Sequence, residues 1–400
     1  MAFLTRGHHP AFPTTPVSEV DLRKDAAIGI LGGAWGWVFT GSRGQVFVAA
    51  SPREATPSTG HREPSWFNGL VMTDEIAEAV AVLRAGGLVA LPTETVYGLA
   101  ADATNIAAVR RIFEAKQRPA SHPLIVHISG ADQLADWVTE VPPTARRLAE
   151  RFWPGPLTLI LPRGERVPAE TAGGLATVAI RAPDHPLAQA LLTAFGGGIA
   201  APSANRFGSI SPTTADDVRT ELGDAIDFVL DGGPCQVGVE STIVQIVDHT
   251  PSILRPGGVS REQLEAILGE PVAVPATSPT PVPGQHPTHY APRAKVVLVK
   301  AGQLISAAVR AHQQGHRVGV LIPPDVSDTA LTTAHAQITV PESMQTYAHE
   351  LYRFLREFDH QGCDLIIASL PQSRGLGLAI ANRLTRAAGP RNDHGPATDL

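Results

Sequence analysis

Residues 115–128 read AKQRPASHPLIVHI, and the fold prediction starts from this stretch. It begins at the end of a predicted amphipathic helix, residues 107–115, whose apolar side chains recur at helical spacing. Pro119 cannot continue a helix, so Lys116 and Arg118 are predicted at its C-terminal edge. The following apolar run, residues 124–128, is typical of a short buried strand.

Two cations placed between a helix and a core strand are expected to be held in fixed positions. Arg118 can fork onto phosphate oxygens, and Lys116 can act as a point charge. The alternative is a solvated helix end at which basic residues complement the helix dipole. This segment alone leaves both interpretations open.

Length and composition limit the classes of protein to consider. The chain has 400 residues, 43% of them hydrophobic and 18% charged, which predicts a globular protein with two domains plus tails. Its net charge of −6 argues against a broad, sequence-independent grip on nucleic acid. The two cysteines, Cys235 and Cys363, form no zinc pattern, so we expect a reducing, cytoplasmic location.

Residues 1–71 do not conform to the rest of the chain. They are rich in Pro, Gly, Ser, Thr and His, without sustained helical periodicity, and we expect a disordered extension. Their apolar run, residues 26–39, is too short for a membrane span, and Arg43 argues against a signal peptide. A capped helix start follows Met72, so we expect the ordered chain to begin there.

The remaining chain predicts two α/β domains joined by a linker. Residues 72–270 alternate short buried strands with helices, as in an open α/β sheet. Residues 271–293 are rich in proline and predict an extended linker. Residues 294–389 predict βαβ units around a small, mostly parallel, Rossmann-like sheet, and the tail at 390–400 should be disordered.

Polar residues follow the strands of the first domain repeatedly. Ligands of open α/β sheets gather at such strand ends, and a cluster of cations and hydroxyls there suits a polyanion. Phosphate chemistry needs mainly positioning and charge stabilisation. The strand-end residues are Thr95, Lys116, Arg118, Arg181, Ser203, Asn205, Ser241 and Arg255.

Seven motifs, taken in order, resemble the threonylcarbamoyl-AMP synthase family, which has a YrdC-like fold. They are PTETVYGL at 92–99, KQRP at 116–119 with PLIVH at 123–127, WPGPLT at 153–158, SAN at 203–205, GVESTIV at 238–244, LRPG at 254–257 and PGQHPTHYAP at 283–292. The last motif and the second domain resemble the longer, two-domain branch. The resemblance implies a YrdC-like open twisted α/β catalytic domain, the Pro-rich linker and the smaller C-terminal domain.

The resemblance also implies a reaction and a set of site residues. L-threonine, bicarbonate and ATP would give threonylcarbamoyl-AMP and pyrophosphate, with Mg²⁺ carried on the phosphates, and the product would pass to the machinery that modifies tRNA beside the anticodon. The L-threonine side is implied at Thr95, His127, Arg181, the backbone of Ala201, and Ser241. The ATP side is implied at Lys116, Arg118, His122, Thr177, Ser203, Asn205, Ser211, Arg255 and Tyr290, with Lys116, Arg118, Ser203 and Asn205 as the catalytic signature.

Two interpretations from other classes are considered. A module that binds double-stranded RNA or tRNA without catalysis could use the same basic cleft, although weak, transient tRNA binding is compatible with the enzyme as well. A carbamoyl-transferring maturation factor of the same fold would carry paired zinc-type cysteine clusters, which two isolated cysteines exclude.

Because Lys116 and Arg118 are expected at a helix end rather than in a core, replacing either with Ala should abolish adenylate formation and change stability little.

Overall fold

The computed structural model describes residues 27–31, 34–40, 46–50, 73–247, 250–276, 280–284, 289–326 and 334–389. The chain divides into two compact units, Met1–Gly69 and Leu70–Leu400. In the first unit, β1 (Ala27–Leu31), β2 (Ala34–Thr40) and β3 (Val46–Ala50) form an antiparallel sheet. The sequence analysis predicted no sheet in this region. The apolar run at 26–39 falls largely on β1 and β2, whereas Arg43, Met72 and the tail at 390–400 lie outside the described ranges.

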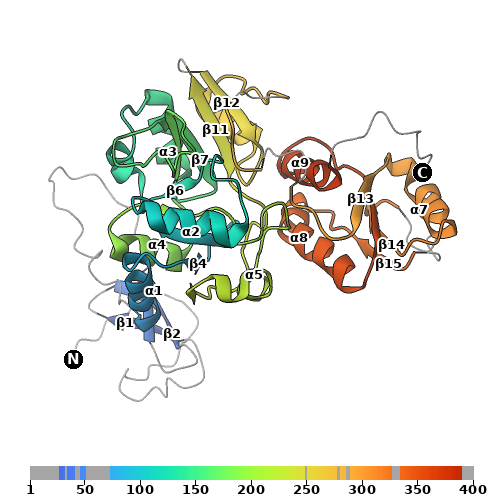
Figure 1. Ribbon diagram of the computed structural model, residues 1–400, viewed down its shortest axis with the longest axis horizontal. Coiled ribbons are helices and arrows are strands. Elements are labelled where there is room, and N and C mark those ends of the chain that lie inside the picture. Colours follow the sequence, from blue (N-terminus) through green and yellow to red (C-terminus); the bar gives the residue numbers. More distant parts are fainter. Residues whose placement is uncertain are drawn as a thin grey trace, which may run out of the picture. The chain divides into compact units, whose positions relative to one another are not determined.

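The second unit contains a nine-stranded mixed sheet in the order β10-β4-β5-β9-β6-β8-β7-β11-β12 (Figure 1). Its pairs β6–β8, β7–β11 and β4–β10 are parallel, and the others are antiparallel. The strands are β4 (Val89–Leu91), β5 (Gly98–Asp102), β6 (Ile125–His127), β7 (Leu157–Pro162), β8 (Thr177–Arg181), β9 (Ile199–Ala200), β10 (Phe228–Val229), β11 (Thr242–Val247) and β12 (Thr250–Arg255).

Helices cover both faces of this sheet because successive strand residues point to opposite sides. In β4, Ala90 packs in the cluster that contains α2, α3, α5 and α6, whereas Val89 and Leu91 pack with α1 and α4. The helices are α1 (Asp74–Arg84), α2 (Ile106–Lys116), α3 (Pro143–Phe152), α4 (Pro186–Phe195), α5 (Ala215–Leu222) and α6 (Arg261–Leu268).

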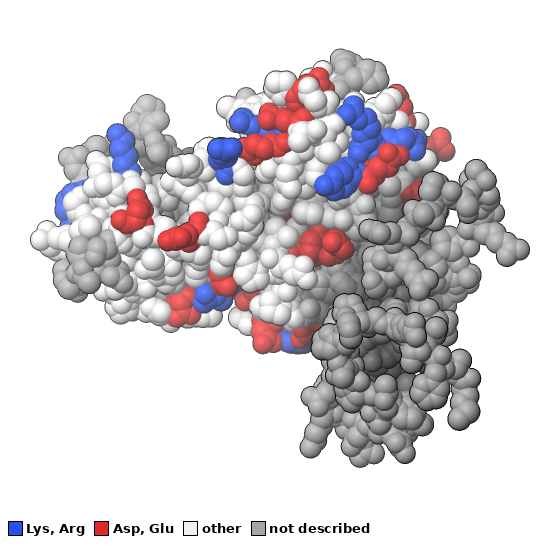
Figure 2. Space-filling model, turned by 180° about the vertical axis from the view of Figure 1, so that it is seen from behind, with Lys and Arg blue, Asp and Glu red and all other residues white. Residues whose placement is uncertain are grey.

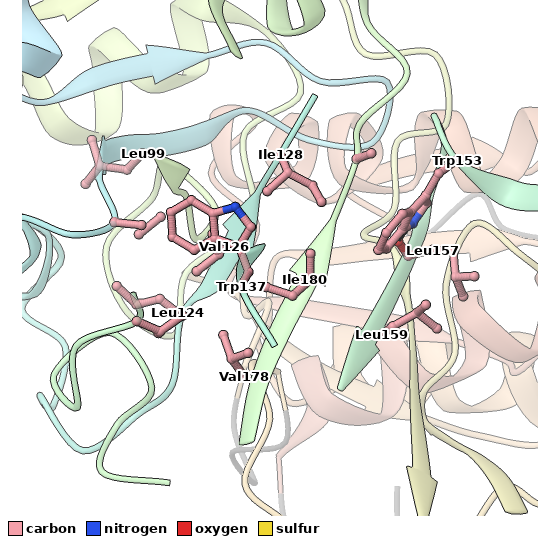
Figure 3. Close-up of a cluster of buried hydrophobic side chains, with 14 of the residues drawn as sticks. Leu99, Leu124, Val126, Ile128, Trp137, Trp153, Leu157, Leu159, Val178 and Ile180 are labelled. Atoms are coloured by element: carbon pink, nitrogen blue, oxygen red, sulfur yellow. Dashed lines mark hydrogen bonds between the residues drawn. The ribbon is translucent and has the colours of Figure 1, made fainter. Parts of the chain in front are cut away.

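The largest core lies on the α2 side of the sheet (Figure 3). Val126, Ile180 and Leu159 come from the adjacent strands β6, β8 and β7, and Trp137 and Trp153 pack around them. All five side chains are buried, so the centre of the sheet is a fixed platform. Residues at the strand ends are held by this platform.

Local signals placed several elements correctly. Thr73 caps α1 by accepting the N–H of Ile76, as the sequence predicted. The cap of α5 is Thr214, with Asp217 completing a capping box. The predicted helix at 107–115 corresponds to α2, and the predicted strand at 124–128 corresponds to β6.

The C-terminal domain has a parallel sheet in the order β13-β16-β14-β15, as predicted from its βαβ pattern. Helix α7 packs on one face of the sheet, and α8 and α9 pack on the other. The elements are β13 (Lys295–Leu298), α7 (Leu304–Gln313), β14 (Val318–Ile322), β15 (Ala336–Thr339), α8 (Met344–His360), β16 (Leu365–Ala368) and α9 (Leu376–Ala388).

Helices α8 and α9 also pack against the domain that contains the nine-stranded sheet, which we call the first domain (Figure 1). Their core cluster includes Val96, Ile210 and Val239, which belong to loops of the nine-stranded sheet. The contact between the domains is therefore a continuous apolar core rather than a tether. None of the helices in the described ranges is both long enough and apolar enough to cross a membrane.

Gly238 tests how closely the domains approach. It has a φ of +77°, and a Cβ there would lie 2.4 Å from the carbonyl oxygen of His349 in α8. Gly238→Ala should cost about 1–2 kcal/mol for the left-handed backbone and about 1–3 kcal/mol more for overpacking. Gly196 is the matched control, because its φ is +72° and a Cβ there would meet nothing within 4 Å. In thermal unfolding, equal shifts for Gly196→Ala and Gly238→Ala would contradict the close approach.

Candidate active site

A small buried cavity lies between the first domain and the linker. Its volume is about 40 Å³, little more than the space of one water molecule. It is lined by Val96, Arg118, Ile125, His127, Arg181, Ala201, Pro202, Ser203, Glu240, Ser241, Arg255, Pro283, Gly284, His289 and Tyr290. The lining therefore combines residues at strand ends of the sheet with two pairs of linker residues, 283–284 and 289–290.

Strand alternation brings two predicted site residues to this cavity, and the loop before β11 brings a third. His127 at the end of β6 lies on the same face as Ile125, and Arg181 at the end of β8 lies on the same face as Ala179. The β6–β8 register pairs His127 directly with Arg181. Ser241 precedes β11, and its hydroxyl lies 2.7 Å from the hydroxyl of Thr158 in β7.

Arg118 and Arg255 carry positive charge into the cavity without a carboxylate partner. Both guanidinium groups are buried, and within the described residues neither forms an ion pair. Arg118 donates to the carbonyl of Pro123 at 2.9 Å, and Arg255 donates to the carbonyl of Ser241 at 2.9 and 3.1 Å. Burial lowers the pKa of Arg118 to about 10, and the nearby Arg255 contributes in the same direction. Both groups remain charged at neutral pH, so the cavity favours an anion.

Arg181 and His127 present a different environment. Arg181 forms a buried ion pair with Glu94 at 2.7 Å, so its charge is already compensated. Burial, followed by the charge of Arg181, lowers the pKa of His127 to about 3. The imidazole is therefore neutral at pH 7, and its Nδ1 lies 3.2 Å from the carbonyl oxygen of Ile125. This corner can bind a polar group by hydrogen bonds without adding a net charge.

The structure corrects the predicted setting of Lys116. Its side chain is only 1% exposed, and its ammonium donates to the carbonyl oxygens of Ser203 and Asn205 at 2.5 Å each. Burial, followed by the charge of Arg118, lowers its pKa well below the usual value. Lys116 thus holds the 203–205 loop from inside the core, so its predicted position outside a core is wrong, and we now expect its loss to lower stability.

The structure brings eight of the predicted site residues to the cavity and leaves six outside its lining. Those lining it are Arg118, His127, Arg181, Ala201, Ser203, Ser241, Arg255 and Tyr290. Those outside are Thr95, Lys116, His122, Thr177, Asn205 and Ser211. Thr177 begins β8 whereas Arg181 ends it, so the two lie at opposite ends of that strand. Ser211 donates to Glu240 at 2.5 Å and supports the wall from behind.

Two buried carboxylates and one imidazole were not predicted as part of the site. Glu94 pairs with Arg181, and Glu240 pairs with Arg383 at 2.7 Å. His289 lines the cavity beside Tyr290, and burial lowers its pKa to about 3. All three stand inside the quoted motifs, but their roles depend on partners far away in sequence.

A larger cavity of about 610 Å³ lies at the carboxyl ends of the strands in the C-terminal domain. Its lining includes one cation, Arg374, and one carboxylate, Asp325, both exposed. Nothing there matches the concentration of buried charge around the first cavity. Among the described residues, no group of three or more His, Cys, Asp or Glu side chains is arranged to hold a metal ion.

Comparisons with known proteins agree across both domains. A family model described as "Telomere recombination" (Sua5/YciO/YrdC) matches residues 81–257, and one described as "Threonylcarbamoyl-AMP synthase, C-terminal domain" matches residues 259–389. The chain is 45% identical over 325 residues to a threonylcarbamoyl-AMP synthase of Bacillus subtilis, covering 79% of this chain and 94% of that one. It is 36% identical over 354 residues to that of Schizosaccharomyces pombe, covering 75% and 84%.

A solved structure supports the same similarity. The crystal structure of Sua5 from Pyrococcus abyssi, complexed with L-threonine, superposes with a TM-score of 0.74 at 41% sequence identity. The superposition covers 78% of this chain and 94% of that one.

Lys116→Ala and Arg118→Ala should separate support of the fold from ligand binding. Lys116→Ala leaves two buried carbonyls unpaired and should destabilise the protein by about 1–3 kcal/mol. Arg118→Ala removes an uncompensated buried charge, so it should lower the melting temperature less while weakening ATP binding at least tenfold. Calorimetric titration and thermal unfolding of both variants measure this contrast. If Arg118→Ala bound ATP like the wild type, the phosphate side would lie elsewhere.

Proposed function

The chain belongs to the threonylcarbamoyl-AMP synthase family, and we propose that its buried cleft condenses L-threonine, bicarbonate and ATP into threonylcarbamoyl-AMP. The chain is a nucleotidyltransferase-type enzyme. The amine of threonine captures bicarbonate as a carbamate with loss of water. A carbamate oxygen then attacks the α-phosphorus of ATP, and pyrophosphate leaves.

The observation that carries this proposal is the pair of buried guanidinium groups that form no ion pair within the described residues. An isolated buried charge is expensive unless a partner neutralises it. Arg118 and Arg255 face the cavity and lack a carboxylate partner among the described residues. Phosphate oxygens of ATP would supply the missing negative charge through bidentate hydrogen bonds. The same groups would stabilise the charge that develops on the phosphates as pyrophosphate leaves.

The other side of the cavity suits L-threonine. Arg181 would hold the amino-acid carboxylate, and the neutral imidazole of His127 can exchange hydrogen bonds with the amine or hydroxyl. The hydroxyl of Ser241 lies between the threonine side and Arg255. Its oxygen accepts a hydrogen bond from Nη2 of Arg255 at 3.0 Å. Thr95 and the backbone of Ala201 complete the proposed side, although the N–H of Ala201 already donates to the carbonyl of Ile125.

Mg²⁺ is proposed to accompany ATP through its phosphates. The buried carboxylates Glu94 and Glu240 are engaged by arginines, so neither is free to serve as a ligand. When bound, the ion would neutralise phosphate charge, and Arg118 and Arg255 would provide the protein's contribution beside it.

A binding module for double-stranded RNA or tRNA is not favoured. On the face shown in Figure 2, the coloured acidic and basic side chains are interspersed rather than gathered into a broad basic surface. We propose instead that the product passes to tRNA-modifying machinery, with at most transient contact with tRNA. Cys235 and Cys363 are free and buried, which is compatible with the predicted cytoplasmic location.

The direct test is synthesis. Purified protein is incubated with ATP, bicarbonate and labelled L-threonine, and the products are separated to detect the labelled adenylate and pyrophosphate. Pyrophosphate release should require threonine. Tight RNA binding without threonine-dependent pyrophosphate release would support the rival function.

The linker is proposed to act as a lid over this cleft. Pro283 and Gly284 line the cavity, and so do His289 and Tyr290; the residues between the two pairs lie outside the described ranges. Tyr290 is buried and has a φ of +61°, a conformation that bulky residues rarely adopt unless their surroundings impose it. Movement of the linker would enlarge this small cavity to admit ATP, and its return would exclude water from the product.

Tyr290→Ala should therefore raise the apparent KM for ATP or release free threonine and AMP. Tyr290→Phe is the matched control, since it keeps the ring that fills the space. Limited proteolysis should show that ATP plus threonine protects the linker of the wild type. Equal cleavage rates with and without substrates would contradict the lid.

A further inference from the structure

Glu240 lines the cavity, and its carboxylate is hydrogen-bonded to residues of the C-terminal domain. It is buried in the loop before β11 and accepts a hydrogen bond from Ser211 at 2.5 Å. Its remaining partners come from the C-terminal domain: Tyr352 of α8 donates at 2.9 and 3.1 Å, and Arg383 of α9 donates through Nε at 2.7 Å. This part of the cavity lining is therefore held from behind by residues of α8 and α9, which do not line the cavity themselves.

Arg383 contacts three separate segments of the chain around the cavity. It is fully buried, and besides Glu240 it donates to the carbonyl of Pro256 at 2.8 Å. Its guanidinium carbon lies 4.9 Å from the centre of the Tyr290 ring, within the range of a cation–π contact. Tyr352, which like Arg383 belongs to the C-terminal domain, stacks its ring on that of Tyr290. The ring centroids lie 6.0 Å apart, and the ring planes are inclined by 25°.

These contacts reach the cavity through neighbouring residues. Glu240 precedes Ser241, whose carbonyl and hydroxyl both accept from Arg255. Pro256, held by Arg383, follows Arg255 directly. Arg255 in turn donates to the carbonyl of Pro283 in the linker at 3.2 Å. A shift of Glu240 or Pro256 would therefore move Arg255, the cation assigned to ATP, together with the linker.

The electrostatics make this arrangement rigid. Burial alone would raise the pKa of Glu240, but the charges of Arg383 and Arg255 and the hydrogen bond from Ser211 outweigh it and hold the pKa at about 2. The carboxylate is thus ionised at neutral pH in a dry environment, where losing one partner leaves an uncompensated charge.

We propose that Arg383 and Tyr352 of the C-terminal domain are positioning residues of the active site, holding Arg255 and Ser241 through Glu240 and the linker through Tyr290. This inference rests on the proposed function for the identity of the ligand. It assigns the second domain a share in ATP binding rather than a role as a passive anchor.

Tyr352→Phe is the sharpest variant, because it removes one hydroxyl from a buried ring. Tyr347→Phe is its matched control: Tyr347 is another buried tyrosine of α8, and its hydroxyl makes no hydrogen bond within the described residues. We expect Tyr352→Phe to raise both the Kd and the KM for ATP at least fivefold with little change in kcat. Tyr347→Phe should leave all three within twofold of the wild type.

Arg383→Met and Arg383→Lys extend the test, with Arg353→Met as the control for an exposed arginine of the same domain. Arg383→Met should weaken ATP more than Tyr352→Phe does, and Arg383→Lys should restore part of the loss because it keeps the charge. If Arg383→Met does not fold, Tyr352→Phe and Arg383→Lys still decide the question.

Calorimetric titration with ATP alone separates this inference from the proposed function. A wild type that binds ATP but makes no adenylate would overturn the synthase function, and the positioning role would still be read from the Kd values. Folded Tyr352→Phe and Arg383→Lys proteins that bind ATP within twofold of the wild type would overturn the positioning role. A lowered melting temperature with unchanged Kd and KM would do the same, because it would show only a docking contact between the domains.

Discussion

Burial of positive charge is the constraint on which the cleft depends. Four guanidinium groups are buried in or beside the cavity, those of Arg118, Arg181, Arg255 and Arg383. Glu94 and Glu240 neutralise two of them, and no carboxylate pairs with the other two in the described ranges. The desolvation cost of the unpaired groups is carried by the rest of the fold, and a polyanionic ligand would offset it. A protein of net charge −6 thus holds two buried guanidinium groups without an ion-pair partner at this one place.

The platform beneath these charges explains why they stay in position. Central strands buried on both faces fix the direction of each side chain, so β6 and β8 present His127 and Arg181 side by side. On the opposite face of the sheet, Ile125 of β6, Ala179 of β8 and Ile243 of β11 pack with Val282 of the linker. The linker is consequently part of the core as well as the roof of the cavity, which couples opening of the cleft to loss of apolar contact.

The sequence was sufficient where the signals are local. The helix predicted at 107–115 and the strand predicted at 124–128 agree with α2 and β6 to within one residue at each end. The clustering of Arg118, Arg181 and Arg255 was inferred from strand ends and from the family resemblance. The sequence did not reveal that Lys116 is buried, because its partners are backbone carbonyls about 90 positions further along the chain. Backbone acceptors have no signature in side-chain composition.

Glu240 shows why the second domain could not be understood from its own sequence. Its partner Arg383 lies 143 positions away, in a helix whose pattern alone predicts an ordinary amphipathic segment. A buried carboxylate needs a cation, and a buried cation needs a carboxylate, so each domain supplies what the other lacks. Hydrophobic contact between domains tolerates small sliding movements, whereas this pair with its fixed hydrogen bonds does not. The domains are therefore held in register at the point nearest the cavity, where a small displacement would have the largest effect on Arg255.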